Sequence, residues 1–150
     1  MKKTLFALLI VLLLAMPIGA AEGLINVQSN HGVTETADRL VDILNKKGMT
    51  IFNRIKHSDA AEKVNVPLRE TELIIFGNPK IGSPLMQCQQ QVAVDLPQKA
   101  LIWKDDTGKV WISYNDPRYL EKRHHITGCE STIKKIEKAL AGITHAAAAQ

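Results

Sequence analysis

The sequence predicts a single α+β domain with helices packed over one face of a sheet. Two observations predict it. Strand patterns and helix patterns alternate over the first half of the chain, and two apolar runs after Pro97 form a hairpin that is followed by helix patterns. Without an expected leader of 21 residues, 129 of the 150 residues remain. That length fits one domain with one core.

The first 21 residues have the composition of a secretory signal peptide. Two lysines precede an unbroken apolar run, Leu5 to Ala15, and Pro17 then stands before Ala20 and Ala21. A membrane anchor is the alternative, but a span takes roughly 20 apolar residues and this run is shorter. We therefore expect an exported protein, periplasmic or secreted, cleaved near Ala20 or Ala21. Membrane contact is expected only through an uncleaved leader.

The charge balance argues against a nucleic-acid partner. The whole chain has 19 Lys and Arg against 15 Asp and Glu, and two of the lysines lie in the leader. The remaining basic residues are scattered, without the basic stripe that follows a phosphate backbone. We expect no nucleic acid among the partners.

Two cysteines lie outside the leader, Cys88 and Cys129. In an oxidising compartment such a pair favours one disulfide. Spacing alone does not show that the two Cα atoms come within bonding range. Two separate thiols therefore stay open as the alternative.

The first half of the chain predicts three strands and two helices. Segments 23–31, 50–56 and 72–77 fit strands, the last of them apolar on both sides and so central. Between the first two, apolar residues recur at helical spacing and lie on one face of a helix, which ends before Gly48: Val33, Ala37, Leu40, Val41 and Leu44. A short helix after the second strand is expected to begin with Ser58 as N-cap.

The second half predicts a helix, a hairpin and two more helices. Ser83 is the expected N-cap of the first helix, with Pro84 in its first turn. The DDTG segment, 105–108, joins two apolar strands, and Asp116 with Pro117 starts a further helix. A last helix is expected over 130–141, followed by a frayed tail. We therefore divide the chain into a main domain, 22–128, and a C-terminal helix with its tail, 129–150.

The hairpin predicts a second apolar sheet face. We expect one face to carry Leu101, Trp103, Val110 and Ile112, and the other Ile102 and Trp111 together with Ile74 or Phe76. One face packs on the helices, so the other needs a cover, which predicts a homodimer or a bound ligand. Coverage by the chain's own helices is the alternative.

The segment FGNPKIGSPLMQCQQQ, 76–91, predicts a strand-to-helix turn. Asn-Pro pairs begin turns, Gly82 allows an unusual backbone angle, and a serine can cap the helix. The alternative is an anion site made of free N–H groups at the helix start with Lys80 beside them. The spacing is not that of a Walker loop.

Several segments together resemble one known family. The run from His57 through AAEKVNVPLRETELIIFGNPKIGSPLM (60–86), then DLP and VWISYNDPRYL, resemble the DUF302 family, small bacterial and archaeal domains without an assigned function. The resemblance covers about Leu24 to His125. It implies a TBP-like fold, with a curved, largely antiparallel sheet holding helices. Glu70 departs from a usual proline, and no catalytic residues are established for the family.

Candidate chemistry centres on His57, at the end of the second strand. It can bind a metal or haem or titrate near neutral pH, although a hydrogen bond to its own turn explains it equally well. With Met86 and Cys88 it would form a soft ligand set for copper or haem iron. No paired-ligand spacing supports that set. His124 and His125 are adjacent and point about 100° apart on a helix.

The sequence favours an exported domain that binds a small ligand or another chain, without established catalysis. Haem or metal binding through His57 is one alternative, and a small enzyme with His57 as acid or base is another. We find neither a G-x-S-x-G elbow nor a convincing carboxylate pair. A small apolar or planar ligand would lie in a cleft bordered by the candidate residues: His57, Asn78, Lys80, Ser83, Met86 and Tyr114.

Overall fold

The computed structural model describes residues 21–150, so the expected signal peptide lies outside the described residues apart from Ala21. Five strands form one antiparallel sheet in the order β1-β5-β4-β3-β2. Their bounds are β1 (Leu24–Ser29), β2 (Thr50–Lys56), β3 (Thr71–Gly77), β4 (Gln98–Lys104) and β5 (Val110–Asn115). The predicted α+β fold, with a largely antiparallel sheet, is confirmed.

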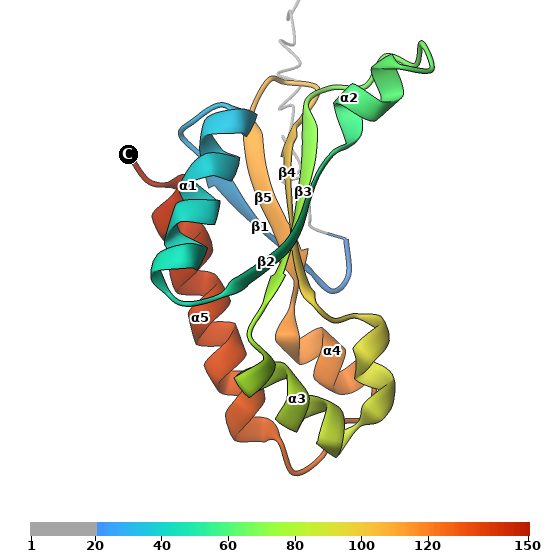
Figure 1. Ribbon diagram of the computed structural model, residues 1–150, viewed down its shortest axis with the longest axis vertical. Helices are drawn as coiled ribbons and strands as arrows, with labels where there is room; N and C mark the ends of the chain where they lie inside the picture. Colours follow the sequence, from blue (N-terminus) through green and yellow to red (C-terminus); the bar gives the residue numbers. More distant parts are fainter. Residues whose placement is uncertain (1–20) are drawn as a thin grey trace, which may run out of the picture.

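The helices lie in three places relative to the sheet: over one face and at each end. Helices α1 (Val33–Lys46) and α5 (Glu130–Ala148) pack against each other on one face, as predicted (Figure 1). At one end of the sheet stands α2 (His57–Glu62). At the other end are α3 (Pro79–Cys88), the 3₁₀ helix η1 (Gln90–Val94) and α4 (Pro117–Arg123). None of the described helices is long and apolar enough to cross a membrane.

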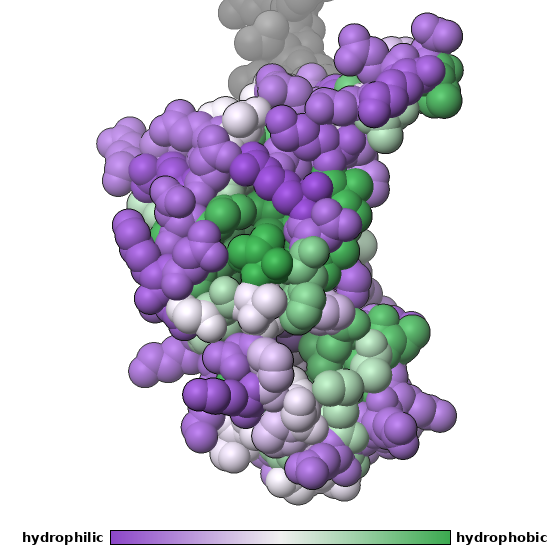
Figure 2. Space-filling model, in the orientation of Figure 1, coloured by the Kyte–Doolittle hydropathy of each residue, from purple (hydrophilic) through white to green (hydrophobic). Residues whose placement is uncertain are grey.

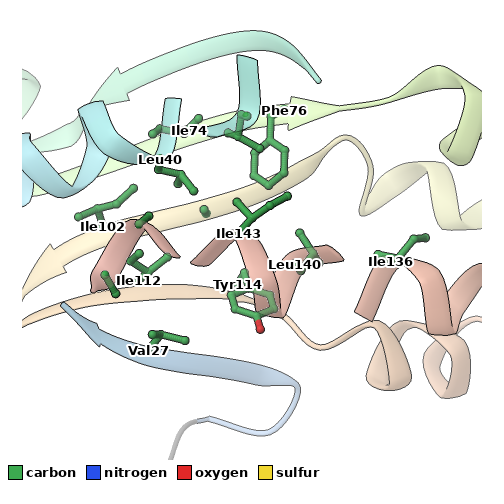
Figure 3. Close-up of a cluster of buried hydrophobic side chains, with 14 of the residues drawn as sticks. Val27, Leu40, Ile74, Phe76, Ile102, Ile112, Tyr114, Ile136, Leu140 and Ile143 are labelled. Atoms are coloured by element: carbon green, nitrogen blue, oxygen red, sulfur yellow. The ribbon is translucent and has the colours of Figure 1, made fainter. Parts of the chain in front are cut away.

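The core lies between the sheet and the helix pair (Figure 3). The apolar stripe of α1 predicted from the sequence is buried there, with Leu40 and Leu44 fully enclosed. Alternate residues of the strands face this stripe, and residues of α5 complete the core. The core residues labelled in Figure 3 include, from the strands, Val27, Ile74, Phe76, Ile102, Ile112 and Tyr114, and, from α5, Leu140 and Ile143. Gly48 ends α1 at a φ of +67°, a backbone angle that favours glycine.

The predicted assignment of the hairpin to two faces is wrong for the second strand, because Val110 and Ile112 share the face of Ile102 instead of that of Trp103. Ile102 pairs with Ile112, and Trp103 pairs with Trp111, so the two tryptophans share a face. Each strand is apolar on both sides, so the alternation alone did not determine which residues oppose each other. The turn decides the register, because Asp105 Oδ1 accepts hydrogen bonds from the Lys109 and Thr107 amides and sets the turn length.

A second apolar face is present opposite the helices. Its side chains are half-buried: Leu73, Ile75, Leu101, Trp103 and Trp111. The Trp103 indole donates a hydrogen bond to Ser113 Oγ at 2.7 Å on the same face. We call these residues the open face of the sheet.

Two predicted helix starts are wrong. Helix α3 begins at Pro79 with Asn78 as N-cap, which places Ser83 and Pro84 inside it. Asn78-Pro79 carries the same cap-and-proline signal as Ser83-Pro84, five residues earlier, and the earlier pair prevails. Helix α2 begins at His57 without a side-chain cap, and Ser58 Oγ instead accepts a hydrogen bond from the Thr71 amide.

The expected frayed tail is also wrong, because α5 continues to Ala148. Thr144 and Ala147 are fully buried, since small side chains let α5 lie close to its neighbours. Arg39 of α1 donates hydrogen bonds to the carbonyl oxygens of Ala147 and Ala149, which satisfies the helix end. The C-terminal helix therefore belongs to the same core as residues 22–128.

Candidate functional site

An apolar cavity of about 480 Å³ lies where α3, the first half of α5 and the start of β2 meet. Ligand cavities of proteins commonly measure about 300–1,000 Å³. Figure 2 shows hydrophobic atoms exposed near the middle of the molecule, beside α5 and above α3, with hydrophilic side chains around them. The cavity is lined by Met49, Phe52, Phe76, Gly77, Asn78, Pro79, Ile81, Gly82, Ser83, Met86, Ala93, Leu96, Pro97, Gln98, Lys135, Ile136, Ala139 and Leu140.

Most residues of the segment 76–86 line the cavity and form one of its walls. Strand β3 ends at Gly77, and the Asn78 side chain caps α3 by accepting a hydrogen bond from the Lys80 amide at 3.0 Å. A Cβ on Gly77 would lie 3.5 Å from the Phe52 ring and 3.6 Å from Pro97. A larger side chain at this position would therefore project between two lining residues and reduce the cavity.

A disulfide joins the two helices that face each other across the cavity. Cys88, the last residue of α3, is bonded to Cys129, the N-cap of α5, with the Cα atoms 6.3 Å apart. Residues 21–150 contain no free cysteine. The bond holds the far end of α3 against the start of α5, and so helps to set the width of the cavity.

Another wall consists of η1 and the segment that follows it. Ion pairs and hydrogen bonds at Asp95 attach this segment to α4. His124 Nε2 of the α4 end lies 2.5 Å from Asp95 Oδ2, and Arg123 Nη1 lies 3.3 Å from Asp95 Oδ1. Lys99 Nζ donates hydrogen bonds to the carbonyl oxygens of Asp95 and Pro97, both at 3.1 Å. These contacts fix Leu96 and Pro97, which line the cavity, against α4.

The family described as "Domain of unknown function DUF302" matches residues 25–143, which include every wall of this cavity. The chain belongs to the DUF302 family. The crystal structure of an uncharacterised conserved DUF302 protein from Bacillus stearothermophilus is similar, with a TM-score of 0.76. It shares 19% sequence identity and covers 85% of this chain and 99% of its own, a likeness that shows the fold.

Curated relatives of this DUF302 chain are longer proteins. "Fluoride-specific ion channel FluC 1" of Brucella suis biovar 1 (strain 1330) is 44% identical over 104 residues, which are 69% of this chain and 41% of that protein. "Fluoride-specific ion channel FluC 2" of Brucella melitensis biotype 1 is also 44% identical over 104 residues, 38% of its length. The chain thus spans about two fifths of the curated relatives that it matches.

The structure of the DUF302 domain brings together half of the predicted ligand-binding residues. Asn78, Ser83 and Met86 line the cavity, and Lys80 lies between two lining residues without lining it. His57 is the first residue of α2, at the opposite end of the sheet from α3 (Figure 1). The predicted cleft that included His57 is therefore wrong, because the length of the sheet separates it from the 78–86 segment.

Tyr114 is not at the cavity either. It is a core residue of β5 with 3% of its surface exposed, and this burial raises the pKa of its hydroxyl. Its side chain packs on the helix face of the sheet rather than bordering a cleft.

The soft metal-ligand set predicted from His57, Met86 and Cys88 is not assembled. His57 lies at the other end of the sheet, and Cys88 is used in the disulfide. The described residues contain no group of three His, Cys, Asp or Glu side chains placed to hold a metal ion. His124 is paired with Asp95.

The cavity walls outside 76–91 have no recognisable signal in the sequence. Met49 and Phe52, Leu96, and Ala139 come from three separate parts of the chain, and their apolar side chains resemble ordinary core residues in the sequence. The DLP segment, 95–97, was part of the family resemblance, but no local pattern links Asp95 to a histidine 29 residues later. Only the fold places these residues around one space.

Proposed function

We propose that this DUF302 domain is an exported binding protein that holds a small apolar molecule in the cavity between α3 and α5. The observation that carries the proposal is the cavity itself, about 480 Å³ with a mainly aliphatic and aromatic lining. Natural ligand sites have this form, a concave apolar surface with few polar groups that orient the ligand. Here those groups are Asn78, Ser83, Gln98 and Lys135.

The lining favours binding over catalysis. Ser83 and Lys135 are the described lining residues of nucleophilic type, and the lining has no histidine, cysteine, aspartate or glutamate that could activate them. Met49 and Met86 are flexible and polarisable, so they adapt to ligands of different shape, and Phe52 and Phe76 offer flat surfaces. A compact apolar or planar molecule suits this site. Haem is less well supported, because Met49 and Met86 are the only usual iron ligands in the described lining, which has no histidine or cysteine.

Export and self-association are further parts of the proposal. Support for export comes from the leader-like residues 1–21 and from two cysteines in disulfide contact. Support for a homodimer comes from the open face, where Trp103 and Trp111 lie side by side and half-buried. Sedimentation velocity tests the proposed homodimer. We expect the wild type to sediment as a dimer and Trp103→Glu as a monomer. A monomeric wild type contradicts the proposal.

The curated relatives favour a second candidate function, association with a fluoride channel. The matched 104 residues form about two fifths of proteins named as fluoride-specific ion channels, so a similar domain is joined to further sequence there. The cavity itself is a poor fluoride site, because its lining is mainly apolar and its few polar groups do not replace the full hydration shell of a small, strongly hydrated anion. The test is co-elution of the chain with a purified fluoride channel in detergent, and separate elution contradicts it.

Binding to the cavity is tested with N-phenylnaphthylamine, an uncharged planar fluorophore. Ala139 is half-exposed and lines the cavity, so Ala139→Trp fills the space from α5. Ala146→Trp places the same side chain on the exposed surface of the same helix, away from the cavity, and is the matched control. Ala93→Trp fills the space from η1.

We expect saturable binding by the wild type and by Ala146→Trp, with affinity at least tenfold weaker in Ala139→Trp and Ala93→Trp. Thermal melting followed by circular dichroism confirms that each variant is folded. No saturable binding by the wild type, or equal binding by all folded variants, contradicts the proposed site.

A further inference from the structure

We propose that the ligand of this cavity is a single-chain amphiphile with an anionic head group, its alkyl chain inside and its head at Lys135. The inference rests on the proposed function and adds the chemical class of the ligand. It follows from the distribution of charge around the cavity, from the hydrogen-bond donors still available there, and from the size of the space.

Lys135 is the one charged side chain in the described lining. It is exposed on α5, directly before the buried lining residue Ile136, so its ammonium group lies at the mouth while its stem follows the apolar wall. No ion pair involves Lys135 or Lys80 within the described residues. The mouth therefore carries positive charge without an internal counter-ion.

Two acidic residues next to lining residues in the sequence, Asp95 and Glu137, already have cationic partners. Asp95, next to η1, is bound by Arg123 and His124. Glu137, two residues after Lys135, accepts hydrogen bonds from Arg118 of α4. Because these carboxylates have cationic partners of their own, they neutralise little of the charge at Lys135, and an anionic head group is favoured over a neutral or cationic one.

The remaining donors indicate how the head is held. The amides of Lys80, Ile81 and Gly82 are used within the first turn of α3, where all three bond to Asn78. The Ser83 hydroxyl and Gln98 amide make no side-chain hydrogen bond among the described residues. Lys135 thus supplies the charge, and these two neutral groups are free to donate to head-group oxygens.

The size of the cavity limits the number of chains. About 480 Å³ lies in the lower half of the usual range for small-molecule sites. That space suits one alkyl chain packed between Phe52, Met86 and Leu140, all of which line the cavity. A two-chain phospholipid needs a considerably larger site, so a fatty carboxylate is the occupant that we propose.

Displacement of bound N-phenylnaphthylamine by three ten-carbon probes tests the charge preference. The probes are decanoate, decanol and decyltrimethylammonium, which share a chain and differ in head charge. The variants are Lys135→Gln and Lys135→Glu, with Lys138→Gln as the matched control, since Lys138 is exposed on α5 and does not line the cavity.

We expect the wild type to bind decanoate at least tenfold more tightly than decyltrimethylammonium. Lys135→Gln should weaken decanoate binding about three- to fivefold, the range of a solvent-exposed ion pair, and leave decanol unchanged. Lys135→Glu should reverse the preference between the anionic and the cationic probe, and Lys138→Gln should resemble the wild type.

Two outcomes overturn this inference, and they differ from failure of the proposed function. If N-phenylnaphthylamine binds and the three probes displace it equally, or if Lys135→Gln weakens decanoate and decanol to the same extent, the anionic ligand class is wrong. The apolar site then stands. If the wild type does not bind N-phenylnaphthylamine, the proposed function fails and this inference fails with it.

Discussion

Removing the disulfide should destabilise the protein and loosen the cavity together. We consider the double variant Cys88→Ser with Cys129→Ser, which keeps similar side-chain size. The bond joins residues 41 apart in the sequence, and closing a loop of that length in the unfolded chain is worth about 4 kcal/mol on the chain-entropy account. The free energy of unfolding should fall by a comparable amount.

The same change should weaken ligand binding, because the bond ties α3 to α5 across the cavity. Without it, the end of α3 is held on the domain through the burial of Leu85, and the cavity wall can move outward. We therefore expect N-phenylnaphthylamine affinity to fall severalfold in a variant that is still folded. A site that is no longer preorganised binds more weakly, because its mobile segments have to become ordered when the ligand binds.

Urea unfolding followed by tryptophan fluorescence measures the stability. With a slope of about 2 kcal/mol per molar urea, the midpoint should fall by about 2 M. Wild type treated with dithiothreitol is the control and should behave like the double variant, whereas the reductant should not change the double variant further. A midpoint that falls by less than about 0.5 M, together with unchanged dye affinity, would refute the assigned role of the bond.

Two predictions concern polar groups away from the cavity. Arg54→Met should lower the free energy of unfolding by about 2 to 3 kcal/mol, since it leaves Glu72, whose side chain is 4% exposed, without its cation. Adding Glu72→Leu should restore most of this stability, as measured by urea unfolding. A double variant no more stable than Arg54→Met contradicts the reasoning. Hydrogen bonds, first of all from the Trp111 indole, lower the pKa of Asp105 to about 2. A carboxyl with a lowered pKa stabilises the fold above its unfolded pKa of about 3.9, and this contribution is lost as the pH falls toward 2. Asp105→Asn should therefore lower the urea midpoint at pH 7 with a deficit that narrows between pH 4 and pH 2, and a deficit independent of pH contradicts the assignment.

Several elements were predictable because their signals are local. The stripe of α1 and its end before Gly48 depend on residues within one segment, as does the start of α4, where Asp116 accepts a hydrogen bond from the Arg118 amide at 2.8 Å. The strands and the fold class followed from alternation and from the order of the elements. Such patterns act over a few residues, so they are visible without the tertiary structure.

Where two local signals competed, the sequence alone did not decide. Asn78-Pro79 and Ser83-Pro84 are both good helix starts, and the structure uses the first. The alanine-rich end of α5 has no large apolar residue, yet it is buried because Arg39 and the neighbouring elements enclose it. Burial of a small residue depends on what packs against it, and that is a property of the whole fold.

The sequence by itself determined the α+β class, most of the elements, the family resemblance and one segment of the site, 76–86. The tertiary structure decided which residues face the cavity, because its walls come from β2, α3, the segment after η1 and α5. It separated His57 from Met86 and paired Cys88 with Cys129. The physical reason is that a cavity is a gap in long-range packing. It depends on side chains that are distant in the sequence, and the local hydrophobic periodicity of a helix or strand carries no information about it.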